Sequence, residues 1–405
     1  MERTLFRGAR IVDGTGAPSF VGDALIEGVR VAALAPEIRR GGAREIDCAG
    51  KVLCPGFVDV HRHIDMAIFA DGFGQAELRQ GITASLAGHC GFSLAPAGNY
   101  GRAVRIRNAP ILGAGGAGDS AGAVGAGGVG ATGGADGAAC ADGAAGADGA
   151  GGVGAAGYAD GAGGAAGEPQ DFPEFSDYLD ALAARRLPFH VGAMVGAGTL
   201  RVAAAGDDAA KPMSPKALEA MLALLRRALD AGAFGLSLGL MYAPDCFAAE
   251  HELDAMAAEV ARRGRVLSVH LRGEGRALVS SIDEVLAVAR RTGAALHISH
   301  LKSTGIDRAA LLDQAMERIA GAVAAGLSVS CDAYPYSAGS TTLLTRLPPE
   351  WQAMEHRARS ARLRDPAERE ALRRELSREH SSWDNALLAA GWETVVPVGA
   401  PGLAM

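Results

Sequence analysis

Two histidines stand one residue apart at the end of an apolar run, FVDVHRHIDM at residues 57–66. Alternate residues of a strand point to the same face, so His61 and His63 are expected to face the same way. Neutral imidazole nitrogens are common zinc ligands, and this pair could form part of a metal site. It could equally be two polar residues where a core strand meets solvent. The pair predicts a metal site only if other ligands fall beside it.

Three more candidate ligands end other apolar runs: Cys90 in GITASLAGHCG, His270 in RVLSVHLR and His300 in ALHISHLK. A thiolate together with imidazoles suits zinc. Taken alone, each histidine is better explained as a polar residue at a strand end, and Cys90 as a small core residue. Only the whole set predicts a site. His89 and His297 lie near the same strand ends, but strand alternation predicts that they face away from it.

Repeated strand–helix units must position these ligands. A helix predicted at 215–231 has Ser214 as its N-cap, Pro215 in its first turn and Gly232 just past its end. Helices around 282–292 and 307–325 also stop at glycines. Strands buried on both faces between helices indicate a parallel α/β fold, a (β/α)₈ barrel whose catalytic residues sit at the carboxyl ends of its strands. The seven predicted strands lie in the runs 51–60, 81–91, 188–196, 233–240, 265–272, 295–302 and 327–334.

Two regions lie outside these strand–helix units: a β-rich N-terminal region and a tract rich in Gly and Ala. Residues 1–54 contain short β-rich runs broken by Gly and Pro and predict a small N-terminal β-sandwich domain, followed by the barrel at 55–405. Within 113–167, 43 of 55 residues are Gly or Ala. The burial of so few large side chains cannot offset the conformational entropy that is lost when the tract becomes ordered. This tract, which includes Cys140, is therefore predicted to be a disordered low-complexity insertion.

The composition limits the classes of function. The chain has 405 residues, 49% of them hydrophobic, with a formal net charge of −7. A mildly acidic balance argues against nucleic acid or an anionic membrane as the main partner. Six cysteines without a CxxC pair, and no apolar leader or spanning stretch, predict a cytoplasmic protein with free thiols. The oligomeric state is left open.

Six motifs carry a family resemblance: PGFVDVHRHID, GITASLAGHCGFSLAP, GLSLGLMYAP, VHLRGEG, HISHLK and DAYPYSAGST. Together they resemble the N-acyl-D-amino-acid deacylase (D-aminoacylase) group of the amidohydrolase superfamily, from about residue 5 to residue 350. The resemblance implies zinc-dependent hydrolysis of N-acyl-D-amino acids to a D-amino acid and a carboxylate. It implies a tight zinc held by Cys90, His270 and His300, and a weaker second position formed by His61 and His63 with Cys90 bridging.

The resemblance also implies where a small-molecule substrate would bind. A lysine and phenols suit the α-carboxylate of an N-acyl amino acid and the tetrahedral oxyanion. The matching positions are Lys302, Tyr242, Tyr334, Tyr336 and Ser340, with Arg272 as a weaker carboxylate candidate.

One part of the family pattern is not found. The reaction needs an Asp at the end of strand eight as general base and then acid. No later Asp falls in a predicted eighth strand, and Asp332 lies in the seventh. The expectation is therefore a barrel without its last strand and with doubtful activity. Two alternatives stay open. One is a cyclic-amide hydrolase related to hydantoinase or dihydroorotase, although Cys90 and the YPYSAGST motif argue against it. The other is an inactive truncated member of the family.

Overall fold

The computed structural model describes residues 2–65, 67–96, 126–130, 172–305, 308–380 and 382–397. The chain divides into two compact units. One consists of Met1–Val58 and Glu77–Ala84, and the other of Asp59–Ala76 and Ser85–Met405.

The first unit carries a five-stranded sheet in the order β3-β2-β1-β4, with β5 also paired to β1. The β1–β2 and β2–β3 pairs are antiparallel, whereas β4 and β5 run parallel to β1. Ala24 and Leu25 alternate on β2, and β1 has a register shift between Phe6 and Ala9, so Leu5 and Leu25 belong to one small core and Ala9, Ile11 and Ala24 to another. The strands are β1 (Arg3–Ile11), β2 (Phe20–Glu27), β3 (Arg30–Ala35), β4 (Arg44–Asp47) and β5 (Val52–Leu53).

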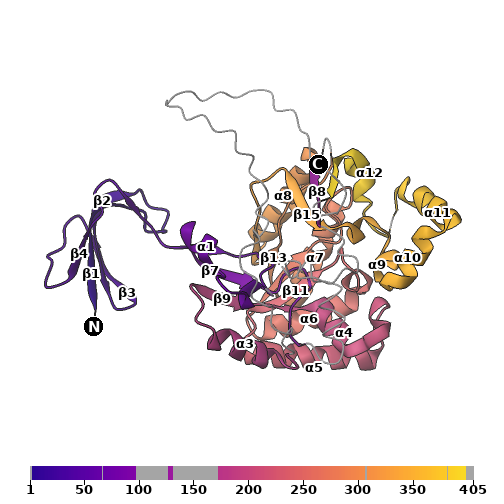
Figure 1. Cartoon of the computed structure of the whole chain (residues 1–405), viewed down its shortest axis with the longest axis horizontal. Helices are drawn as coiled ribbons and strands as arrows, with labels where there is room; N and C mark the ends of the chain where they lie inside the picture. The colour runs from indigo at the N-terminus through magenta and orange to yellow at the C-terminus, as the bar shows by residue number, and fades with distance from the viewer. Residues whose placement is uncertain are drawn as a thin grey trace. The chain divides into compact units, whose positions relative to one another are not determined.

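The second unit is an α/β structure with five parallel strands in chain order, β10-β11-β12-β13-β14. Helices connect successive strands, and in Figure 1 they lie outside the strands. The apolar side chains of both layers form one large core. The strands are β10 (Val195–Gly196), β11 (Gly235–Gly239), β12 (Val266–His270), β13 (Ala295–Ile298) and β14 (Val329–Cys331). The helices between them are α4 (Ala197–Ala205), α5 (Pro215–Ala231), α6 (Glu250–Arg262), α7 (Leu278–Thr292) and α8 (Ala309–Ala324).

A further sheet has the order β6-β7-β9. Its strands are β6 (Phe57–Asp59), β7 (Ile82–Ala87) and β9 (His190–Ala193). The run predicted as one strand at 188–196 is divided into β9 and β10 at Met194. Each of the seven runs predicted as barrel strands therefore contains a strand, which fits the predicted α/β barrel class. Among the described residues, no parallel strand follows β14.

Helix α5 has the predicted bounds, and its N-cap is formed as expected. The Ser214 hydroxyl accepts the Ala217 backbone N–H at 3.2 Å, and Gly232 ends the helix in a left-handed conformation. Helix α7 starts at Leu278, four residues before the predicted 282.

We expect Ser214→Ala to lower the free energy of unfolding by about 1 kcal/mol, because it removes the acceptor for one N–H of the first turn. Denaturant unfolding measures this change. The control is Ser280→Ala, because the exposed Ser280 hydroxyl donates to the Ala277 carbonyl and caps no N–H. Equal stability of Ser214→Ala and the wild type would contradict the capping assignment.

The remaining described elements are shorter or lie outside these sheets and their connecting helices. Residues 126–130 form β8, which pairs with β15 and β16; the rest of the predicted 113–167 insertion lies outside the described residues. No helix among the described residues is both long and apolar enough to cross a membrane. The elements are η1 (Ala67–Phe69), α1 (Gln75–Arg79), β8 (Ala126–Gly130), α3 (Phe175–Ala184), η3 (Gly206–Ala210), η4 (Asp245–Phe247), β15 (Ala338–Thr342), η5 (Leu343–Arg346), α9 (Pro349–Ala353), α10 (His356–Arg364), α11 (Pro366–Leu376), α12 (Ala386–Ala390), η6 (Trp392–Thr394) and β16 (Val395–Pro397).

Candidate metal centre

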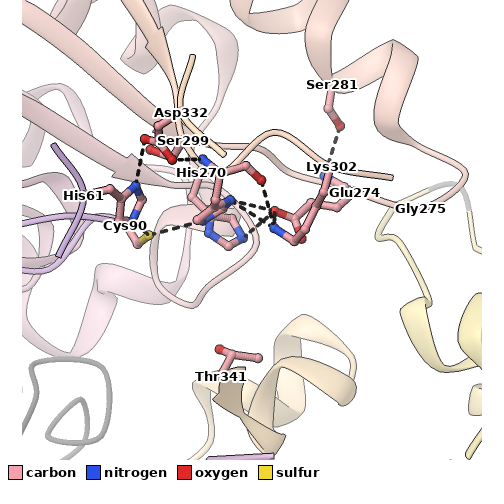
Figure 2. A network of polar contacts seen from close by, with 12 residues as sticks. His61, Cys90, His270, Glu274, Gly275, Ser281, Ser299, Lys302, Asp332 and Thr341 are labelled. Atoms are coloured by element: carbon pink, nitrogen blue, oxygen red, sulfur yellow. Dashed lines mark hydrogen bonds and ion pairs between the residues drawn. The ribbon is translucent and has the colours of Figure 1, made fainter. Parts of the chain in front are cut away.

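The candidate ligands gather at the carboxyl ends of four strands within the second unit. Figure 2 shows His61, Cys90 and His270 close together. His270 is the last residue of β12, and the others lie two or three residues past their strands: His61 after β6, Cys90 after β7 and His300 after β13.

Cys90 and two histidines face one another at close range. The Cys90 Sγ atom is 3.5 Å from His61 Nε2 and 3.6 Å from His300 Nε2. One ligand atom from each of these residues lies within 4.8 Å of the others, and the same holds for a second set, His270, Glu274 and His300. His63 lies beside them, with its ring centroid 5.5 Å from that of His61. Both sets have the size of a metal site.

The backbone at two of these residues is strained. Among the described residues, Cys90 (φ 54°) and His300 (φ 38°) are the non-glycine residues with left-handed backbone. Such a conformation costs about 1–3 kcal/mol and persists at sites where the surroundings enforce it. Neighbouring glycines allow the close packing, because a Cβ at Gly239 would collide with the Cys90 carbonyl oxygen and one at Gly91 with Asp245.

Several buried nitrogens at the site have no hydrogen-bond partner among the described residues. They are both ring nitrogens of His270 and of His89, and Nδ1 of His63. Burial lowers the pKa of His270, and burial with the nearby His61 and His300 lowers the pKa of His63 to about 3. Both rings are therefore neutral, which is the form that binds a metal ion. Burial raises the pKa of the Cys90 thiol, so a cation is needed to favour the thiolate. A thiol, imidazoles and unpartnered nitrogens together fit a zinc ion.

Asp332 holds one face of the cluster. Its Oδ2 is 3.1 Å from His61 Nδ1 and 2.8 Å from His297 Nε2, while Oδ1 accepts the His300 backbone N–H at 2.6 Å. Burial acts to raise the pKa of Asp332, but hydrogen bonds from His297 and His61 lower it well below its usual range. With Nδ1–H donated to Asp332, His61 directs Nε2 toward Cys90. Asp332 is thus engaged by three donors and is not a free base.

Two histidines that were expected to face away from the site contact it instead. His297 reaches it through Asp332, and the His89 ring stacks on His61 with centroids 4.2 Å apart. The prediction assumed that strand alternation continues past the strand ends. Alternation ends there because Gly88, Cys90 and His300 have positive φ. His89 follows one of these turns, whereas His297 lies within β13 and it is His300 whose backbone departs from the strand.

Glu274 was not predicted from the sequence, although it lies in the quoted VHLRGEG motif. Its Oε1 is 2.6 Å from Lys302 Nζ, 3.1 Å from His300 Nδ1 and 3.8 Å from His270 Nε2. Burial acts to raise the pKa of Glu274, but Lys302 and the two histidines lower it well below its usual range. The sequence did contain a signal for this residue, because Glu274 follows the candidate ligand His270 by four residues.

The predicted substrate-binding residues divide into two groups. Lys302, Tyr242 and Tyr334 lie at the site: the Tyr242 ring is 4.6 Å from that of His270, and Lys302 Nζ is 5.5 Å from the Tyr334 ring centre. The others are exposed or already engaged by other residues. Tyr336 is 75% exposed, Ser340 is an exposed residue of β15, and Arg272 binds Glu284 at 2.9 Å and the Cys246 carbonyl at 2.8 Å.

Comparison with known proteins identifies the family. The profile of the amidohydrolase family matches residues 44–370. This chain belongs to the amidohydrolase family. The predicted resemblance to the N-acyl-D-amino-acid deacylase group is confirmed by relatives from Alcaligenes xylosoxydans xylosoxydans. An N-acyl-D-glutamate deacylase is 33% identical, and a D-aminoacylase is 27% identical; each alignment covers 84% of this chain and 58% of the relative.

Solved structures agree with this family assignment. The N-acyl-D-glutamate deacylase from Bordetella bronchiseptica, complexed with zinc and a phosphonate mimic of the tetrahedral intermediate, has a TM-score of 0.62 at 29% identity. A D-aminoacylase structure has a TM-score of 0.63 at 29% identity. Each comparison covers 82% of this chain and 58% of the other chain. This amidohydrolase thus spans less than two thirds of the length of these relatives.

Proposed function

We propose that the chain provides the metal centre and substrate site of an enzyme that hydrolyses N-acyl-D-amino acids to a D-amino acid and a carboxylate. The observation that carries the proposal is the cluster of Cys90 with His61 and His300, beside Lys302 and the unpartnered His270. A zinc ion held by Cys90, His270 and His300, with a weaker position at His61 and His63, would polarise the amide carbonyl and lower the pKa of its bound water.

The chain's own residues bind and orient the substrate in this proposal. Lys302 provides an ammonium group close to the candidate ligands, and the α-carboxylate of an N-acyl amino acid is a suitable partner for it. The buried Tyr242 hydroxyl, 3.3 Å from Thr341 Oγ1, can donate a hydrogen bond to the oxyanion. Asp332 keeps His61 in place.

Arg346 supports a preference for acidic side chains. It lies at the end of η5 and interacts electrostatically with Glu274, Tyr242 and Asp384, and burial lowers its pKa. Its side chain has no hydrogen bond or ion pair to another described residue. This half-buried guanidinium has no direct ion pair among the described residues, and a side-chain carboxylate of the substrate would provide one. Relatives that act on N-acyl-D-glutamate and N-acyl-D-aspartate, 33% and 30% identical, agree with this preference.

The test is a comparison of substrates with zinc-loaded protein. We expect turnover of N-acetyl-D-glutamate, slower turnover of N-acetyl-D-methionine, and none of N-acetyl-L-glutamate or hydantoin. Arg346→Met should lower kcat/KM for N-acetyl-D-glutamate by about 10–100-fold, because it removes one hydrogen bond to a charged group. It should lower kcat/KM for N-acetyl-D-methionine much less. Arg357→Met, at an exposed arginine of α10, is the control.

Different results would reject different parts of the proposal. Hydrolysis of hydantoin in place of the linear substrates would favour the cyclic-amide alternative. A folded, zinc-loaded chain that hydrolyses none of them would support the inactive alternative. Equal losses on both D substrates in Arg346→Met would contradict its assignment to the side chain.

A further inference from the structure

Two donors converge on one carboxylate oxygen beside the candidate ligands. Lys302 Nζ is 2.6 Å from Glu274 Oε1, and His300 Nδ1 is 3.1 Å from the same oxygen. Lys302 Nζ also lies 3.1 Å from His300 Nδ1 and 3.2 Å from the His300 carbonyl. Figure 2 shows the carboxylate and the ammonium close together beside the histidine rings. His300 Nδ1 therefore has both an acceptor and a competing donor within reach.

The outcome of this competition decides whether His300 can bind a metal. A neutral imidazole has one N–H and one acceptor nitrogen. If Nδ1 carries the proton and donates it to Glu274, the lone pair of Nε2 faces Cys90 Sγ at 3.6 Å. If Nδ1 instead accepts a hydrogen bond from the Lys302 ammonium, the ring hydrogen is on Nε2, which then cannot be a ligand.

We propose that Glu274 is a positioning residue that selects the metal-binding tautomer of His300. Its carboxylate accepts Nδ1–H of His300 and draws the Lys302 ammonium onto itself, so Lys302 does not donate to the ring. This inference rests on the metal centre of the proposed function. It connects the lysine assigned to the substrate carboxylate with a histidine assigned to the metal.

Glu274 is better suited to this role than to that of a ligand. Its Oε1 already contacts the Lys302 ammonium, and a metal ion bound to the same oxygen would lie next to that positive charge. The Oε1 atom is also 3.8 Å from His270 Nε2, beyond hydrogen-bond distance, so Glu274 leaves His270 free.

The opposite side of the cluster has the same arrangement. Asp332 contacts Nδ1 of His61 at 3.1 Å, and His61 Nε2 faces Cys90 Sγ at 3.5 Å. A carboxylate behind each histidine fixes its tautomer and ring plane, as is usual for histidines that bind metals. Among the described residues, a lysine competes for the ring nitrogen at His300 and none does so at His61.

Three variants of the full chain test the proposal: Glu274→Gln, Lys302→Met and the double variant. Zinc affinity is measured by competition with a chromogenic chelator. We expect Glu274→Gln to weaken zinc binding by about 10–100-fold. Lys302→Met should bind zinc as the wild type does, because the Glu274–His300 contact remains. The double variant should recover part of the loss, because the competing donor is gone. Glu284→Gln, which removes a carboxylate bound only to Arg272 among the described residues, is the matched control.

The tautomer itself is measured on metal-free protein by nitrogen-15 NMR of the imidazoles, with His300 assigned through His300→Gln. The proposal predicts the Nδ1–H form in the wild type and the Nε2–H form in Glu274→Gln. An Nε2–H form in the wild type would overturn it, as would a loss of zinc in Lys302→Met equal to that in Glu274→Gln. Failure of the wild type to bind zinc would reject the metal centre, and the NMR result would still decide the tautomer.

Discussion

Cys90→Ser is expected to remove most of the bound zinc and to lower kcat/KM for N-acetyl-D-glutamate by more than about 100-fold. Residues that only orient metal ligands already contribute about 10–100-fold to metal affinity or activity. Cys90 is expected to contribute more, because it is the thiol toward which His61 and His300 direct Nε2. Serine has nearly the same shape, so the strained turn at residue 90 can be kept while the soft sulfur ligand is lost. Zinc content after gel filtration and initial rates measure the effect.

Cys331→Ser is the control for this variant, because Cys331 is exposed on β14 and belongs to neither set of candidate metal ligands. Circular dichroism of both variants establishes that they fold. A folded Cys90→Ser protein with wild-type zinc content and rate would show that the thiol is a core residue, the alternative that the sequence left open.

The largest expected loss of stability comes from a buried ion pair away from the site. Arg201 and Glu252 are 1% and 0% exposed and contact each other at 2.5 Å. Arg201 also donates to the Ala209 carbonyl at 2.7 Å, and Glu252 accepts the Met213 backbone N–H at 2.7 Å. The pair thus connects α4 and α6 to the segment before α5.

Glu252→Gln should lower the free energy of unfolding by about 3–5 kcal/mol, because it leaves a buried guanidinium without its counter-charge. Urea unfolding followed by circular dichroism measures the change. Glu219→Gln breaks an ion pair with Arg226 in which the glutamate is 65% exposed, so it should cost less than about 1 kcal/mol. Similar losses in the two variants would mean that burial does not govern the strength of these pairs.

The sequence predicted features that depend on local spacing. Ser214 and Gly232 bound α5 because capping needs only a hydroxyl before the helix and a glycine after it. His61, Cys90, His270 and His300 were found because each follows a recognisable strand, and such strand ends meet on one face of a parallel α/β fold.

Contacts between distant segments were not predictable in this way. The roles of His89 and His297 depend on the backbone turns at Gly88, Cys90 and His300, which a pattern of alternation does not contain. Glu274 acquires its role only when β12 brings it to Lys302, 28 residues away in sequence. Arg346 stands out because no described residue forms a direct ion pair with it, which only the folded chain reveals.

The central claim is that metal bound at Cys90, His270 and His300 enables hydrolysis of an N-acyl-D-amino acid. The most direct measurement strips the full chain with a chelator, titrates zinc back and follows release of D-glutamate from N-acetyl-D-glutamate. We predict no release without zinc, and a rate that rises as zinc binds and then levels off. A folded chain that binds zinc and releases no D-glutamate at any zinc concentration, or one that releases it equally well without metal, would contradict this account.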